Sequence, residues 1–136
     1  MIPRFRAWDK STQTMLDVSL IDFKKSVLIG EHWEFGETNF INFDEIELMQ
    51  STGLKDKDGQ EIFEGDIVKR DGVKRPEVVS FGEWTDVDSL GYKEQYIGFY
   101  FESEHEGQEW LHSVQPQFNH LYKVIGNIYE NKEVDN

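Results

Sequence analysis

The stretch from residue 48 to residue 72, LMQSTGLKDKDGQEIFEGDIVKRDG, is rich in acidic residues and glycines, as calcium-binding loops are. An EF-hand loop needs oxygen ligands at loop positions 1, 3 and 5, glycine at 6 and a bidentate glutamate at 12. With Gly59 at position 6, Asp56 and Asp58 fall at positions 3 and 5. Leu54 then takes position 1 and Gly65 takes position 12, so two of the strongest ligands are missing. The spacing argues against a calcium site.

The same stretch also fails the pattern of a phosphate-binding loop. Such a loop has four residues between its glycines and then Lys followed by Ser or Thr, whereas Gly53 and Gly59 are separated by five residues. Asp tolerates the left-handed backbone region and Gly reaches it at no steric cost. The pairs Asp58-Gly59 and Asp71-Gly72 therefore predict two turns between strands.

The histidines show no spacing typical of a catalytic or metal site. The sequence has four of them, His32, His105, His112 and His120, without an HExxH motif, and His112-Ser113 is not part of a GxSxG elbow. His105 lies among Glu102, Glu104, Glu106 and Glu109, which could offer oxygens to a divalent metal, but a solvated acidic loop or edge strand is the favoured interpretation. We expect no catalytic residue, no metal and no cofactor, and hence no enzyme.

Four basic residues flank the Asp71-Gly72 turn: Lys69, Arg70, Lys74 and Arg75. A basic hairpin tip can contact phosphates. It can equally dock on an acidic face of another copy, or act as a charged strand edge that resists aggregation. Three interpretations of this hairpin therefore stay open.

Aromatic residues provide the other candidate contacts. The run Arg4 to Trp8 alternates, which places Phe5 and Ala7 on one face of a strand and Arg4, Arg6 and Trp8 on the other. The segment Tyr96 to Phe101 resembles an aromatic stacking platform, although core packing of Ile97, Phe99 and Phe101 is favoured because few basic residues are near. The candidate partner-binding residues are Arg6, Trp8, Trp84 and Trp110.

Strand patterns dominate the chain. Asp9 to Gln13 predicts a turn before a strand that starts near Met15, and Pro76 predicts the start of a strand over 78–84. Residues 17–47 fit neither the helical nor the strand period cleanly. Several short strands separated by Gly, Asp and Pro turns predict a mainly β protein, either a small barrel or a sandwich.

The charge is extreme for 136 residues: 27 acidic against 14 basic residues, a net of −13. Such a field makes nonspecific binding to nucleic acid or to an anionic membrane unlikely. It fits a solvated surface, or else a surface that mimics nucleic acid to capture a DNA-handling protein. The absence of cysteine and of any long apolar run predicts a soluble, cytoplasmic protein.

Three blocks together resemble the YopX family, which phages and prophages of Gram-positive bacteria encode. They are FRAWD at 5–9, LMQSTGLKDKDG with EIFEGDIV at 48–68, and VIGNIYEN at 124–131. Ser51 and Phe63 stand where Tyr is usual in that family. The resemblance implies a C-terminal SH3-type β-barrel over residues 48–136, closed by a strand ending at Tyr129, and an N-terminal β-rich arm or subdomain over residues 1–47. It implies no activity, cofactor or catalytic residue.

The expected function is that of a phage or prophage accessory protein in the cytoplasm of its bacterial host. We expect a non-enzymatic module that binds an unknown protein partner or self-assembles as a homo-oligomer. The alternatives are an acidic decoy of a DNA-handling protein, or a weak nucleic-acid binder through the basic hairpin at 69–75.

Overall fold

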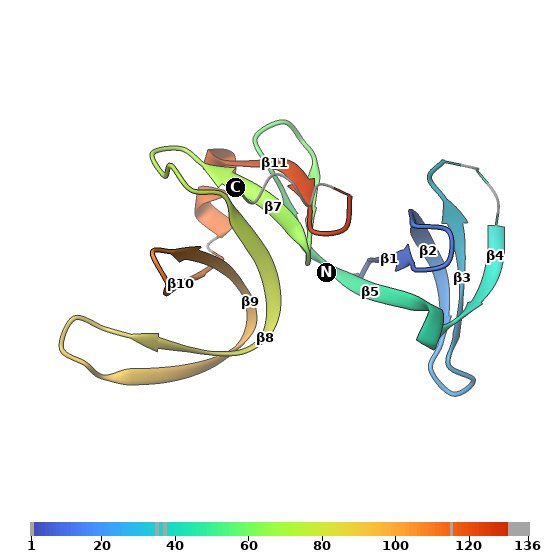
Figure 1. Ribbon diagram of the computed structural model, residues 1–136, viewed down its shortest axis with the longest axis horizontal. Coiled ribbons are helices and arrows are strands. Elements are labelled where there is room, and N and C mark those ends of the chain that lie inside the picture. Colours follow the sequence, from blue (N-terminus) through green and yellow to red (C-terminus); the bar gives the residue numbers. More distant parts are fainter. Residues whose placement is uncertain (1, 35, 37, 115, 131–136) are drawn as a thin grey trace. The chain divides into compact units, whose positions relative to one another are not determined.

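The computed structural model describes residues 2–34, 36, 38–114 and 116–130. They form β-strands and two short 3-10 helices (Figure 1). The chain divides into two compact units, Met1–Gly53 and Leu54–Asn136. The domain boundary after residue 47 stays a prediction.

The N-terminal unit is an antiparallel meander. Its elements are β1 (Phe5–Asp9), β2 (Thr14–Asp22), β3 (Val27–His32), β4 (Thr38–Asn42), the 3-10 helix η1 (Phe43–Glu45) and β5 (Ile46–Lys55), whose last two residues belong to the second unit. The sheet order is β4-β3-β2-β1-β5, and β6 (Glu61–Phe63) follows β5 in the same order. The predicted turn after Asp9 and the returning strand near Met15 are confirmed.

A register shift explains why residues 17–47 gave no clean period. The pairing of β2 with β3 slips between Val18 and Leu20, so one extra residue is accommodated on β2. Such a bulge changes which residues face the core from that point on. The core of this unit consists of Ala7, Leu16, Leu28, Ile41 and Ile46.

The C-terminal unit is built on an open five-stranded sheet. Its elements are β6, β7 (Asp66–Arg70), β8 (Glu77–Val87), β9 (Lys93–His105), β10 (Gln108–Ser113), the 3-10 helix η2 (Pro116–Leu121) and β11 (Tyr122–Asn127). The sheet order is β10-β9-β8-β7-β11. Because β10 and β11 lie at opposite ends of this order, the sheet is not closed into the barrel that the family resemblance implied. Its core consists of Ile62, Val68, Val79, Phe101 and Tyr122.

The opening stretch contains the turns that its Asp-Gly pairs predicted. Gly59 has a φ of 83° and its N–H donates to the Asp56 carbonyl at 3.1 Å. Gly72, also with a φ of 83°, lies in the connection from β7 to β8. Among the described residues, no three or more His, Cys, Asp or Glu side chains are grouped so that they could hold a metal. In the same part of the chain, no helix is long and apolar enough to cross a membrane.

Candidate functional site

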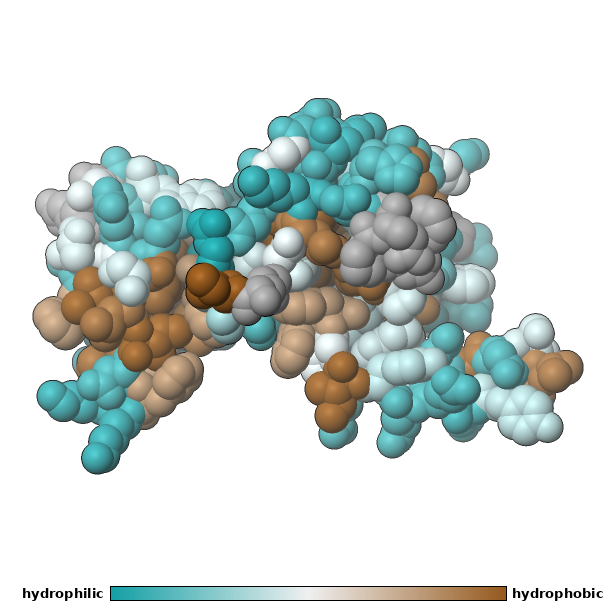
Figure 2. All heavy atoms as spheres, turned by 180° about the vertical axis from the view of Figure 1, so that it is seen from behind, coloured by the Kyte–Doolittle hydropathy of each residue, from teal (hydrophilic) through white to brown (hydrophobic). Residues whose placement is uncertain are grey.

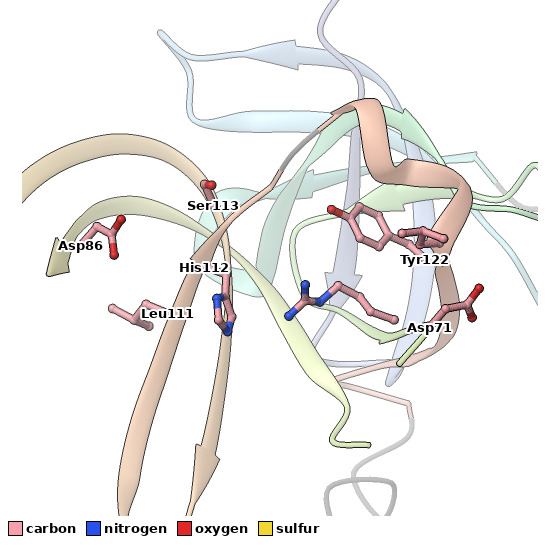
Figure 3. Close-up of a pocket in the computed structure, with 8 residues that line it drawn as sticks. Asp71, Asp86, Leu111, His112, Ser113 and Tyr122 are labelled. Atoms are coloured by element: carbon pink, nitrogen blue, oxygen red, sulfur yellow. The ribbon is translucent and has the colours of Figure 1, made fainter. Parts of the chain in front are cut away.

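A cleft of about 390 Å³ opens on the C-terminal unit (Figure 3). It is lined by Arg70, Asp71, Asp86, Leu111, His112, Ser113, Leu121 and Tyr122. These residues come from the end of β7, the far half of β8, β10, and the junction of η2 with β11. Asp86, near the end of β8, and His112, on β10, thus line the same cleft.

The buried carboxylate of Glu77 contacts two residues that line this cleft. Glu77, at the start of β8, is only 1% exposed, and its Oε1 accepts a hydrogen bond from Nε of Arg70. Nε2 of His112 lies 3.8 Å from the second oxygen, Oε2. That oxygen is buried and accepts no hydrogen bond from the described residues. The guanidinium of Arg70 also lies 5.6 Å from the centre of the Phe101 ring.

The cleft has mixed charge. Arg70 and His112 offer donors to a polar or anionic group, while the carboxylates of Asp71 and Asp86 stand at the same opening and repel anions. The ion pair with Glu77 already uses part of the Arg70 charge. The arrangement therefore suits a small polar group or a partner side chain, and its charge does not select a phosphate.

The second feature of this unit is a long hairpin of β8 and β9, which packs against the core at Phe99 and continues past it. The two strands pair from Val78↔Glu102 to Val87↔Lys93 and bend together along their length (Figure 1). Gly82 and Gly98 face each other in the middle of the hairpin, and both have a φ of 153°. Only glycine adopts that region readily, so this pair permits the bend. We call residues 80–99 the β8–β9 arm.

An aromatic stack reinforces one face of the arm. The Trp84 ring stacks on Tyr96, with centroids 5.1 Å apart, and on Tyr100, with centroids 5.6 Å apart. Trp84 is thereby buried. Offset aromatic pairs of this kind contribute about 0.5–1.5 kcal/mol beyond their buried area. Together with the edge-to-face pair of Phe81 and Phe99, whose centroids are 4.8 Å apart, the stack adds side-chain contacts to the backbone pairing of the ribbon.

The far half of the arm exposes apolar side chains to solvent. Leu90 is 80% exposed, Ile97 76%, Tyr92 69% and Val87 53%. Figure 2 shows brown and pale side chains among teal ones at the free end of the arm, at lower right. The prediction that Ile97 would pack in the core is wrong, whereas Phe101 on the same strand face is buried as predicted. The reason is that β9 extends past the end of the core.

The predicted partner-binding residues differ in their accessibility. Arg6 and Trp8 are buried, so the prediction that they lie on a polar face of β1 open to a partner is wrong. Trp84 lies inside the aromatic stack. Trp110 on β10 is 39% exposed, and the Arg75 guanidinium lies 5.5 Å above its ring. A role in partner binding stays a prediction for all four.

The basic hairpin is largely engaged within its own unit. Nζ of Lys69 donates to the carbonyl of Lys74, Arg70 pairs with Glu77, and Arg75 covers Trp110. The three interpretations of this hairpin as a phosphate contact, a docking element or a protected edge remain predictions.

A separate polar pair stands in the N-terminal unit. Nε2 of His32 lies 2.9 Å from Oδ2 of Asp9, and both side chains are buried. Burial raises the pKa of Asp9, but hydrogen bonds from His32, Ser11 and Thr12 outweigh it and lower that pKa to about 2. Nδ1 of His32 is 3.2 Å from the Asn39 amide nitrogen. Because both ring nitrogens of His32 have partners, we assign this buried pair a structural role.

Sequence reasoning missed several residues of the cleft and the arm, namely Glu77, Leu90, Tyr92 and Ile97. One signal was available: Glu77 alternates in phase with Val79, which is buried. A charged residue in phase with a buried face requires a partner. The exposure of Ile97 had no such signal, since the run from Tyr96 to Phe101 has the pattern of a core strand.

The chain belongs to the YopX protein family, whose model matches residues 4–134. It is similar to a protein of known crystal structure, protein EF1440 from Enterococcus faecalis. The two are 28% identical, the match covers 100% of this chain and 99% of that chain, and the TM-score is 0.51. No match was found among curated proteins.

Proposed function

We propose that the protein is a non-enzymatic protein-binding module and that the β8–β9 arm is its contact element. The observation that supports this is the exposure of Val87, Leu90, Tyr92 and Ile97 on one projecting hairpin. Clustered apolar side chains on a protein surface mark interaction sites. We assign binding and no reaction to the chain.

The energetics of the arm favour a partner. A two-stranded ribbon is only marginally stable in water by itself. Each large apolar side chain that passes from solvent into an interface gains about 1.5–3 kcal/mol. The stack of Trp84 on Tyr96 and Tyr100 keeps the ribbon in shape, so that less ordering is needed on binding.

A phage or prophage accessory role in a bacterial cytoplasm follows from what the family resemblance implies. We also infer that the C-terminal unit is an open relative of an SH3-type barrel, since its five antiparallel strands and β6 enclose one core around Val68 and Phe101.

A second candidate function is the acidic decoy. The exposed part of the arm has four carboxylates, Glu83, Asp86, Asp88 and Glu94, against the single cation of Lys93. A narrow acidic ribbon could mimic a nucleic-acid strand and attract a basic DNA-handling protein. The apolar residues between these carboxylates favour the first proposal.

The test is affinity capture from a bacterial lysate, with and without nuclease, using three forms of the chain. The wild type is compared with Leu90→Asp on the arm and with Phe23→Asp, which changes an apolar residue of the N-terminal unit that is 70% exposed. We expect the wild type and Phe23→Asp to capture a partner protein even after nuclease treatment, and Leu90→Asp to capture none of it. Equal recovery by both variants contradicts the role of the arm, and recovery that nuclease abolishes favours nucleic acid instead.

A further inference from the structure

The outer edge of β9 lacks a neighbouring strand over half of its length. β9 pairs with β8 from residue 93 to residue 102, but β10 covers its other side only from residue 100 to residue 105. Within the described part of the chain, residues 93–99 therefore have a strand on one side only. An open strand edge is a ready template for another strand.

The turns at the two ends of β9 show which backbone groups face this edge. The β9–β10 hairpin closes over Glu106 and Gly107, whose φ values are 53° and 77°, next to the pair His105↔Gln108. A two-residue turn of this type is flanked by a hydrogen-bonded pair, and hydrogen-bonded pairs alternate along an antiparallel ladder. The odd-numbered residues of β9 thus direct their N–H and C=O groups away from β8.

The opposite end of the ribbon gives the same phase. The N–H of Asp88 donates to the carbonyl of Tyr92 at 3.0 Å. The even-numbered residues of β9 therefore direct their N–H and C=O groups toward β8. On the open edge, the outward groups of Lys93, Gln95 and Ile97 lie beyond the last residue that pairs with β10. All three of these residues are exposed.

We propose that residues 93–99 pair antiparallel with the same residues of a second copy, around a two-fold axis at Tyr96. This inference rests on the proposed function, since it names the partner of the arm. The register centred on Tyr96 uses all seven uncovered residues of the edge and none that β10 already covers. It also places odd-numbered residues opposite odd-numbered residues, as the outward backbone groups require.

The side chains of this edge are self-complementary in that register. Glu94 falls opposite Gly98 of the second copy, and Lys93 opposite Phe99. No two like charges face each other, whereas directly opposed like charges would destabilise the pair. The segment matches itself without any change of sequence, which is the condition for a symmetric dimer.

Aromatic residues add contact area on one face of the joined ribbon. Tyr96 already stacks on Trp84 with centroids 5.1 Å apart. At the two-fold axis it meets Tyr96 of the second copy, so that four rings lie in one row. On the other face, Ile97, 76% exposed in the single chain, is covered by Gln95 of the second copy.

Disulfide trapping tests the register directly, because the chain has no cysteine of its own. Two residues in a non-hydrogen-bonded antiparallel pair have Cα atoms about 4.5 Å apart, within the range of about 4.4–6.8 Å that a disulfide spans. Tyr96→Cys is expected to form a covalent dimer at least tenfold faster than Leu90→Cys, which is more exposed but lies at the tip outside the paired segment. Equal rates for the two variants overturn the proposal.

A charge exchange supplies a second, reversible measurement. Tyr96→Lys and Tyr96→Glu each place like charges opposite each other at the two-fold axis, so each alone is expected to sediment as a monomer. An equimolar mixture is expected to recover the dimer that the wild type forms. Circular dichroism of each variant checks that the arm is folded. A mixture that stays monomeric while the wild type dimerises overturns the Tyr96 register.

The outcome separates this inference from the proposed function. A wild type that is monomeric throughout the micromolar range overturns pairing with a second copy. If that monomer still captures a protein that Leu90→Asp loses, then the arm binds a different partner and the proposed function stands.

Discussion

Oδ2 of Asp56 accepts a hydrogen bond from the backbone N–H of Val124 at 2.8 Å, across 68 residues of sequence. Its Oδ1 accepts from the N–H groups of Asp58 and Gln60, both at 2.9 Å. The buried carboxylate of Asp56 thus stabilises the turn after β5 and links that turn to β11. An acidic residue that sequence analysis tested as a calcium ligand is instead an acceptor for backbone amides.

Removing that acceptor should loosen β11. We expect Asp56→Ala to lower the free energy of unfolding by about 2–4 kcal/mol, because hydrogen bonds to charged groups contribute about 1.5–3 kcal/mol each and the freed amides are left unpaired. The measurement is denaturant unfolding combined with hydrogen exchange at the Val124 amide, whose protection should fall. Asp58→Ala, at the exposed turn, is the control and should change stability by less than about 0.5 kcal/mol.

The Asp9–His32 pair should make stability depend on pH at the acid end. The folded pKa of Asp9 is about 2, below its ordinary value of 3.8. A lowered folded pKa stabilises the native state above pH 3.8, and this contribution is lost as the pH falls through 2. We expect Asp9→Asn to cost about 2 kcal/mol at neutral pH, with a difference from wild type that shrinks below pH 3.8.

The check for Asp9 is a series of unfolding curves for wild type and variant from neutral pH down to pH 2. Asp44→Asn, an exposed aspartate of η1, controls for the general effect of removing a carboxylate. A cost of Asp9→Asn that stays constant over the whole range would show that hydrogen-bond geometry, and not charge, gives the stability.

The Arg70–Glu77 pair should show strong energetic coupling. Glu77 is 1% exposed, so Arg70→Met leaves a buried carboxylate without its cation and should cost about 3–5 kcal/mol. The double variant Arg70→Met with Glu77→Leu removes both charges and should recover most of that loss. A double-mutant cycle by urea unfolding measures the coupling. Additive effects of the two substitutions would contradict a specific ion pair.

The bend of the β8–β9 arm should depend on Gly82 and Gly98. A Cβ atom added at either position would meet no other atom within 4 Å. The cost of Gly82→Ala therefore comes from its backbone φ of 153° alone. Strain of this kind is worth about 1–3 kcal/mol. We expect a loss of that size in unfolding experiments, and a changed near-ultraviolet circular dichroism signal as Trp84 separates from Tyr100.

A glycine of the arm tip provides the matched control. Gly91 has a φ of 86° and equally open surroundings, in the left-handed region that Asn tolerates. Gly91→Asn should therefore be much milder than Gly82→Ala. If both substitutions are equally mild, the glycine pair does not determine the bend.

Local patterns in the sequence determined a large part of this protein. The Asp-Gly pairs fixed the turns at Gly59 and Gly72, and Pro76 preceded β8 as predicted. Alternation identified β1 and the buried end of β9, and three short blocks identified the family. These features depend on the conformational preferences of neighbouring residues, which a sequence displays directly.

Only the tertiary structure decided which residues are covered. The slip at Val18 depends on the pairing partner β3, and the burial of Glu77 depends on Arg70 lying on a neighbouring strand. The strand pattern of Ile97 is that of a core residue, but β9 runs past the core and leaves it exposed. Each outcome is set by contacts between segments far apart in the chain, and the period of a single segment holds no information about what lies opposite it.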